Sequence, residues 1–160
     1  MNLAKPARLP SVCAEQSYFV TTSADQKRFL FQSEPMANLF IETLYSYCRQ
    51  NKFLLHEFVL MPNHLHVILT PTEITLERAM QFIKGGYSHR VNSELGKKFE
   101  VWQRGFTDRR IRNRSEYDGF REYIHMNPVE GGLVSRPEEF RYSSAHPGFK
   151  LDPPPAYLSG

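Results

Sequence analysis

The sequence predicts an α+β fold of the ferredoxin-like (RRM-like) type, an antiparallel sheet with helices on one face plus a C-terminal helix. The predicted elements follow one another as strand, helix, strand, strand, helix, strand and helix, which is the split β-α-β order with one added helix. The length of 160 residues is that of about one domain. With 41% hydrophobic and 23% charged residues, the composition excludes a disordered or disulfide-scaffold chain. We expect a single domain over 1–160, with a core at about 16–146 and irregular terminal arms.

The first elements are an arm, a strand and a helix. Residues 1–15 contain two prolines and little periodicity, which predicts a loose arm. The run 18–22 is aromatic and β-branched, as is typical of a strand. Apolar residues recur at helical spacing over 34–50, with Pro35 in the first turn, which predicts an amphipathic helix.

A hairpin and a second helix follow. The runs 52–61 and 64–70 are strand-like and are separated by a short Pro-Asn turn, so we expect them to pair. Residues 75–95 place apolar side chains on one helical face. Gly85 and Gly86 are a weak point inside that predicted helix.

The last part of the chain supplies a short strand and a third helix. We expect the strand at 109–112 and the helix at 115–126, with Ser115 as its N-terminal cap. Pro128 is expected to stop the helix, because the residue before a proline disfavours helical geometry. The chain from 135 onward is expected to be irregular.

Two histidines stand out in the second hairpin strand. Because strand side chains alternate, His64 and His66 point to one face, opposite the apolar residues that can pack on the helices (Leu65, Val67 and Leu69). Adjacent imidazoles are natural ligands for one metal ion. The pattern His-x-His alone is equally compatible with two exposed histidines on a polar strand face.

The last helix contains a tyrosine and an amide four residues apart. Tyr123 and Asn127 therefore lie one above the other on one face. A tyrosine hydroxyl is a possible nucleophile, and an amide oxygen is a possible metal ligand. They are also compatible with a boundary aromatic and a helix cap.

Positive charge is concentrated in one stretch of the chain. The formal net charge is +3, but residues 84–114 hold nine basic and three acidic residues, so this stretch is +6 and the rest is −3. Aromatic side chains lie among these charges. A local basic stretch is typical of a nucleic-acid contact surface, although charge runs are more often simply solvated.

The cellular compartment is predicted from sequence features that are missing. The two cysteines, Cys13 and Cys48, have no metal or redox spacing, as is common in a reducing cytoplasm. We find neither a signal peptide nor an apolar run of membrane-span length. A cytoplasmic protein without membrane contact is expected.

These blocks together resemble the HUH single-tyrosine transposases, most closely the REP-associated tyrosine transposases. The similar segments are 61–69 (MPNHLHVIL), 102–106 (WQRGF), 122–129 (EYIHMNPV) and 132–134 (GLV). The resemblance covers roughly 18–144, with the blocks in order and at sensible spacing.

The resemblance implies a transposase that cuts and rejoins single-stranded DNA at hairpin or palindromic elements. His64 and His66 would bind Mg²⁺ or Mn²⁺, and Tyr123 would form a 5′-phosphotyrosine link. Asn127 takes the place of a third ligand, where insertion-sequence members commonly have Gln. Insertion-sequence members act as dimers with the tyrosine helix in trans, whereas REP-associated members act as monomers in cis. Monomer and homodimer both remain open here.

Given this resemblance, the basic stretch over 84–114 is the expected DNA contact. Arginine suits phosphate because its planar fork donates two hydrogen bonds at once. Tyr87 or Trp102 could stack an unpaired base, although Trp102 suits a core position equally well and Tyr87 is a rival nucleophile to Tyr123. The complete set of expected DNA contacts is Lys84, Tyr87, Arg90, Trp102, Arg104, Arg109, Arg110, Arg112 and Arg114.

Two other classes of function are compatible with parts of the sequence. A non-catalytic, RRM-like nucleic-acid-binding protein would have the same fold, although no RRM aromatic signature is present. A zinc hydrolase could combine His64 and His66 with His56 or His89, although no carboxylate partner stands at a known spacing.

Overall fold

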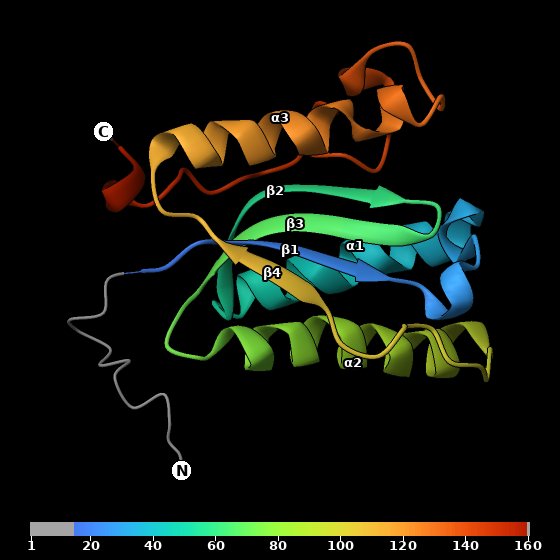
Figure 1. The fold of residues 1–160 in the computed structure, drawn as a ribbon. Helices are drawn as coiled ribbons and strands as arrows, with labels where there is room; N and C mark the ends of the chain where they lie inside the picture. The colour runs from blue at the N-terminus through green and yellow to red at the C-terminus, as the bar shows by residue number, and fades with distance from the viewer. Residues whose placement is uncertain (1–14, 160) are drawn as a thin grey trace.

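The computed structural model describes residues 15–159, so the arm expected over 1–15 lies almost entirely outside the described residues. Its centre is a four-stranded antiparallel sheet with the strand order β2-β3-β1-β4 (Figure 1). The predicted α+β class and the predicted order of elements are confirmed. The elements are β1 (Tyr18–Ser23), α1 (Glu34–Arg49), β2 (Phe53–Met61), β3 (His64–Pro71), α2 (Leu76–Leu95), β4 (Thr107–Arg110) and α3 (Arg114–Glu130).

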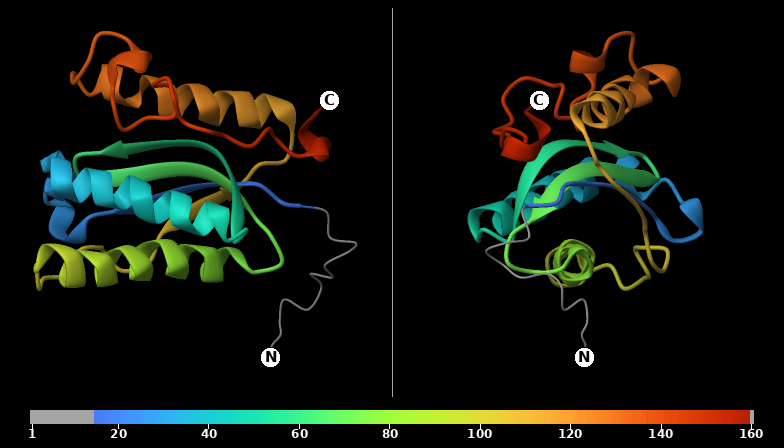
Figure 2. Two further views of the ribbon diagram at one scale, coloured as in Figure 1. Left: turned by 180° about the vertical axis from the view of Figure 1, so that it is seen from behind. Right: turned by 60° about the vertical axis from the view of Figure 1, so that its left-hand side comes forward.

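The helices cover both faces of the sheet. Helices α1 and α2 pack side by side on one face, and α3 lies across the opposite face (Figures 1 and 2). Helix α3, the added C-terminal helix of the prediction, therefore covers part of the face opposite α1 and α2. The reason is that β2 and β3 also place Val59 and Ile68 on that face, where Tyr117 and Ile124 of α3 bury them. Burial of such apolar side chains holds α3 on the sheet.

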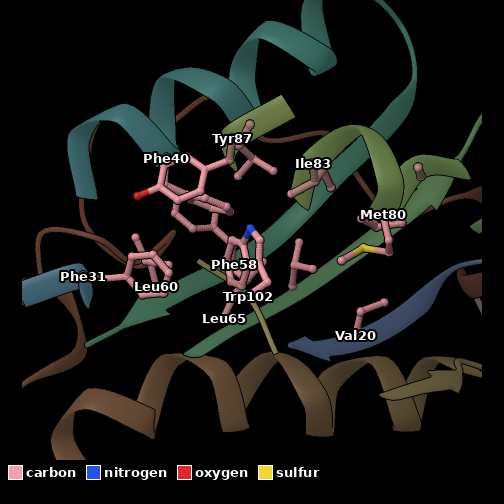
Figure 3. Close-up of a cluster of buried hydrophobic side chains, with 14 of the residues drawn as sticks. Val20, Phe31, Phe40, Phe58, Leu60, Leu65, Met80, Ile83, Tyr87 and Trp102 are labelled. Carbon is pink, nitrogen blue, oxygen red and sulfur yellow. The ribbon is translucent and has the colours of Figure 1, made fainter. Parts of the chain in front are cut away.

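The larger core lies between the sheet and the helix pair α1–α2. Leu65, Val67 and Leu69 point into it, as their alternation predicts. Figure 3 shows aromatic side chains from several elements meeting there, among them Phe40, Tyr87 and Trp102. This core anchors the strand that holds the histidines on its other face.

The two helices of the large core begin at side-chain caps. Ser33 accepts a hydrogen bond from the Met36 amide at the start of α1, and Thr75 accepts one from Arg78 at the start of α2. The glycine pair does not break α2. A β-carbon on Gly86 would lie 2.1 Å from the Tyr47 hydroxyl oxygen, so the absence of a side chain at Gly86 lets α1 and α2 approach closely.

Helix α3 differs from the prediction at both ends. Its cap is Asn113 rather than Ser115, because the Asn113 side chain accepts the Glu116 amide at 2.9 Å. Pro128 lies inside the helix, so the expectation that it stops the helix is wrong. A proline removes only its own amide donor, and the Gly131 amide still bonds to the Asn127 carbonyl at 2.9 Å. The last turn therefore continues to Glu130.

The short fourth strand begins two residues earlier than predicted, at Thr107, and ends at Arg110 rather than at 112. All four residues of β4 are exposed, so no alternation of apolar and polar residues marks its register.

The C-terminal segment has little regular structure, as predicted, but it packs on the sheet beyond residue 146. The Asp152 amide donates to the Leu55 carbonyl, and the Asp152 carboxylate accepts from the Leu55 amide. Leu158 is buried in the smaller core beneath α3. No helix in the described part of the chain is long and apolar enough to cross a membrane.

Candidate active site

The two strand histidines lie side by side on the face covered by α3. The hairpin turn ends at His64, and the ring centroids of His64 and His66 are 4.7 Å apart. His66 is only 5% exposed, and its Nδ1 lies 2.8 Å from the hydroxyl oxygen of Thr21 on β1. His66 Nε2 is buried and has no hydrogen-bond partner. When the ring proton sits on Nδ1, Nε2 presents an unused lone pair.

Burial favours the neutral form of both imidazoles. Burial, together with the proximity of His64, lowers the pKa of His66 to about 3. Burial also lowers the pKa of His64, and the positive charge of Lys27 adds to this, while a hydrogen bond with Asn127 opposes it. A neutral imidazole is the form that binds a metal ion.

Helix α3 brings Tyr123 and Asn127 to this pair. The Tyr123 ring is 5.1 Å from the His66 ring, edge to face, and 5.9 Å from the ring of Phe19. Tyr123 is 47% exposed, so a macromolecular substrate can reach it. The Asn127 side chain lies near the ring of His64 and opposes the lowering of the His64 pKa. One chain therefore gathers both strand histidines, the tyrosine and the amide in one place.

These residues fit a divalent metal ion. An unpartnered, buried ring nitrogen on His66 beside a second neutral histidine is an incomplete ligand set of the kind a metal completes. The Nδ1 atom of His64 contacts the Asn63 side-chain oxygen at 2.7 Å, which fixes the ring orientation as an outer-shell partner does. The amide oxygen of Asn127 is the third candidate ligand.

The structure separates the other histidines from this site. His56 is buried with Nε2 on the Thr70 hydroxyl and Nδ1 on the Asp152 carbonyl, so both nitrogens are occupied. His89 is exposed on α2, across the sheet from the pair. Within residues 15–159, no three His, Cys, Asp or Glu side chains gather in a possible metal group. The described residues therefore offer no third histidine ligand beside His64 and His66, although the zinc-hydrolase hypothesis requires one.

Several basic residues of the predicted DNA contact form ion pairs or hydrogen bonds with other groups of the chain. Arg90 pairs with two glutamates, and Arg112 and Arg114 each pair with a carboxylate one turn along α3. Lys84 donates to the carbonyls of Gln103 and Gly105, and burial lowers its pKa. These four side chains therefore already make contacts within the chain, which makes them weaker candidates for DNA contact than unpaired arginines.

Three arginines are better placed for DNA. Arg104, Arg109 and Arg110 are exposed, and none forms an ion pair with a described residue. Arg109 pairs across strands with Phe19, so the two side chains share a face of the sheet. Because Phe19 also stacks near His66, Arg109 lies beside the histidine–tyrosine cluster.

The structure places both predicted stacking aromatics in the core. Tyr87 is fully buried, and its hydroxyl donates to the Met36 carbonyl. Trp102 is 8% exposed and lies among the core side chains (Figure 3). Its indole nitrogen donates to the Lys84 carbonyl. The expectation that either stacks a base is wrong for this conformation, and the alternative of Trp102 as a core residue is confirmed. Tyr87 is likewise inaccessible as a nucleophile.

Nothing in the sequence indicates that Lys27 is a neighbour of the histidine pair. Ser23, the last residue of β1, is opposite His64, so the chain that follows passes beside the histidine pair. Gln26 and Lys27 have positive φ values of 54° and 53°, a left-handed conformation that is costly for residues other than glycine and often occurs at functional sites. Only the pairing register of β1 with β3 reveals this neighbour, which no sequence motif marks.

A split β-α-β sheet with paired strand histidines under a helical tyrosine is similar to the arrangement expected for HUH single-tyrosine proteins. The family model described as Transposase IS200 like matches residues 13–127. The chain therefore belongs to the IS200-like transposase family.

Individual relatives agree with this assignment. A REP-associated tyrosine transposase of Escherichia coli K12 is 28% identical over 100 residues, covering 61% of this chain and 58% of its own length. An uncharacterised protein of Haemophilus influenzae is 29% identical over 150 residues, covering 72% of this chain and 82% of its own. The match thus spans less than two thirds of the E. coli relative.

A solved structure shows the same fold. A REP-associated tyrosine transposase bound to a REP hairpin superposes with a TM-score of 0.71 at 23% identity. The match covers 91% of this chain and 84% of that one.

Proposed function

We propose that this protein is a metal-dependent single-stranded DNA endonuclease and strand transferase that acts at hairpin or palindromic elements. One observation supports this most strongly. In a member of the IS200-like family, an accessible tyrosine lies 5.1 Å, ring to ring, from a buried histidine whose Nε2 has no partner. The single domain would act in the cytoplasm, as the sparse cysteines predict.

His64, His66 and Asn127 are the proposed ligands of Mg²⁺ or Mn²⁺. A bound ion would polarise the oxygens of the scissile phosphate and hold that phosphate in place. The chain itself contributes neutral imidazoles, a fixed ring orientation at His66 through Thr21, and an amide oxygen on the helix of the nucleophile. Because oxygen ligands suit Mg²⁺ better than imidazole does, Mn²⁺ is an equal candidate.

Tyr123 is the proposed nucleophile. Its hydroxyl oxygen attacks the phosphorus atom, and the bond from phosphorus to the 3′ oxygen breaks. The tyrosine loses its proton and the departing oxygen gains one, which leaves a 3′-hydroxyl and a 5′-phosphotyrosine. A 3′-hydroxyl then reverses the step on the same or another strand. The link conserves the energy of the broken phosphodiester, so rejoining requires no nucleotide cofactor.

The proposed DNA path crosses the β4 edge of the sheet. Arg109 lies beside Phe19, which contacts the Tyr123 ring, so a strand that follows the arginines reaches the nucleophile. Lys27 follows β1 at the His64 end of the histidine pair, so it is a further candidate for a phosphate contact. The E. coli relative and the hairpin-bound structure support a hairpin as the partner.

His64→Ala tests this function. His64 is the better choice because His66 is buried and stacks on Phe19, so removing the His66 ring would also cost stability. We expect cleavage of a single-stranded hairpin oligonucleotide with Mn²⁺ to fall by about 100-fold or more, with hairpin affinity and melting temperature little changed. His89→Ala, an exposed histidine on α2, is the matched control and should cleave normally.

The results separate the proposal from its rival. Unimpaired cleavage by the His64 variant would contradict the ligand assignment. Tight hairpin binding by the wild-type protein without any cleavage, under Mg²⁺ or Mn²⁺, would favour the non-catalytic binding protein.

A further inference from the structure

Strand β2 contains an irregularity that turns a carboxylate toward α3. Leu55 is opposite Leu69 of β3, and Glu57 is opposite the next residue, Ile68, so His56 is one extra residue in β2. Such a bulge breaks the alternation of faces. Glu57, which is the one acidic residue of β2, consequently lies under α3.

The Glu57 carboxylate is buried and fully engaged. It is 5% exposed, and its Oε1 lies 2.7 Å from His125 Nε2 and accepts the Ser144 hydroxyl at 2.6 Å. Its Oε2 accepts Arg121 Nε at 3.1 Å. Burial alone would raise the pKa of Glu57, but the hydrogen bonds from His125, Ser144 and Arg121 bring it below its usual value. A buried carboxylate with partners of this kind is costly to separate from them.

The partners of Glu57 lie on one flank of α3 and the proposed catalytic groups on the other. Ile124 faces the sheet. At about 100° per residue, Arg121 and His125 project roughly 60–100° to one side of it, and Asn127 and Tyr123 project by similar angles to the other. The first flank faces β2, and the second faces the histidines on β3.

We infer that Glu57 is a positioning residue that sets the rotation of α3 and so keeps Tyr123 beside the histidine pair of its own chain. The inference rests on the proposed function of Tyr123. A helix held only by Ile124 and other apolar contacts could turn about its axis, because such contacts are not directional. Glu57 accepts hydrogen bonds from Arg121 and His125, which are one turn apart, and these two bonds define a single rotation. The arrangement also keeps the site within one chain.

The test compares Glu57→Gln with Glu122→Gln. Glu122 is exposed on the solvent side of the same helix, so its variant makes the same chemical change without touching β2. In single-turnover cleavage of a hairpin oligonucleotide, we expect the Glu57 variant to lose about 10- to 100-fold in rate, as a misplaced nucleophile does. Its affinity for the hairpin should stay within about twofold of wild type, since the DNA contacts are elsewhere. Glu122→Gln should match wild type in both.

A double-mutant cycle shows whether the effect passes through α3. Because Glu57 acts through His125, the variant Glu57→Gln/His125→Gln should cleave little more slowly than Glu57→Gln alone. Losses that multiply, or a Glu57→Gln variant that cleaves at the wild-type rate, would overturn the inference. So would a rate loss matched by an equal loss of affinity.

Amide hydrogen exchange tests the positioning without any reaction. We expect faster exchange over 114–130 in Glu57→Gln, with α1 and α2 protected as in wild type and no change in Glu122→Gln. Unchanged exchange in α3 would refute the inference even if cleavage is slower. If the wild-type protein forms no adduct but α3 loosens as expected, the proposed function fails while the role of Glu57 stands.

Discussion

Replacing Arg104, Arg109 and Arg110 by alanine should weaken hairpin binding and make it less sensitive to salt. These arginines are exposed and form no ion pair with a described residue, although Arg110 also donates to the Gln16 side-chain oxygen, so a phosphate competes with no carboxylate for them. Each phosphate contact adds about 0.7 to the slope of log affinity against log salt on single strands, and about 0.9 on duplex DNA. Removing three contacts should therefore reduce that slope by about 2–3.

The slope translates into an affinity difference. Between about 50 and 200 mM salt, the wild-type protein should lose about 20- to 40-fold more affinity than the triple variant. Fluorescence anisotropy of a labelled hairpin oligonucleotide, titrated at several salt concentrations, measures both quantities.

The matched control replaces Arg90, Arg112 and Arg114, which changes the net charge equally. Because these three are held by carboxylates, their removal should reduce the slope by less than about 1. An equal reduction in both triple variants would mean that net charge alone governs binding. An unchanged slope in the first variant would refute the proposed path.

Lys27→Ala should reduce the same salt slope by about 1, the value of one lost phosphate contact, and an unaltered slope would place Lys27 outside the DNA contact. Gly85→Ala should stabilise the protein by about 0.5–1 kcal/mol, since this helical glycine has open space around it. Gly86→Ala should destabilise it by about 1–2 kcal/mol, because the new β-carbon collides with Tyr47; urea unfolding of the two variants should give opposite signs. The depressed pKa of Glu57 means that its carboxylate stabilises the fold above the ordinary value of 4.5 and that this contribution disappears as pH falls through the folded-state pKa. Urea unfolding should therefore show Glu57→Gln less stable than wild type at neutral pH, with the gap closing in acid, and a gap independent of pH would contradict this.

Local patterns were enough to predict much of the fold. The alternation around His64 and His66 places the apolar set in the core and the imidazoles on the other face, because side-chain direction in a strand depends only on position. The four-residue spacing of Tyr123 and Asn127 likewise places both on one flank of α3. Both features follow from backbone geometry alone.

Features that depend on distant segments escaped prediction. The extra residue His56 in β2 is visible only in the pairing with β3, and without it Glu57 has no evident reason to face α3. The approach of Lys27 to His64 likewise follows from strand register. Buried Trp102 and exposed Tyr123 look alike in sequence, since an aromatic side chain suits either a core or a binding surface.

The central claim is that Tyr123 is the nucleophile. Wild-type protein and Tyr123→Phe should be incubated with a single-stranded hairpin oligonucleotide and Mn²⁺, and covalent protein–DNA adducts separated on a denaturing gel. We predict an adduct with the wild-type protein and none with the variant, which keeps the ring beside His66 and should bind the hairpin equally well. An adduct that survives in Tyr123→Phe would contradict the account.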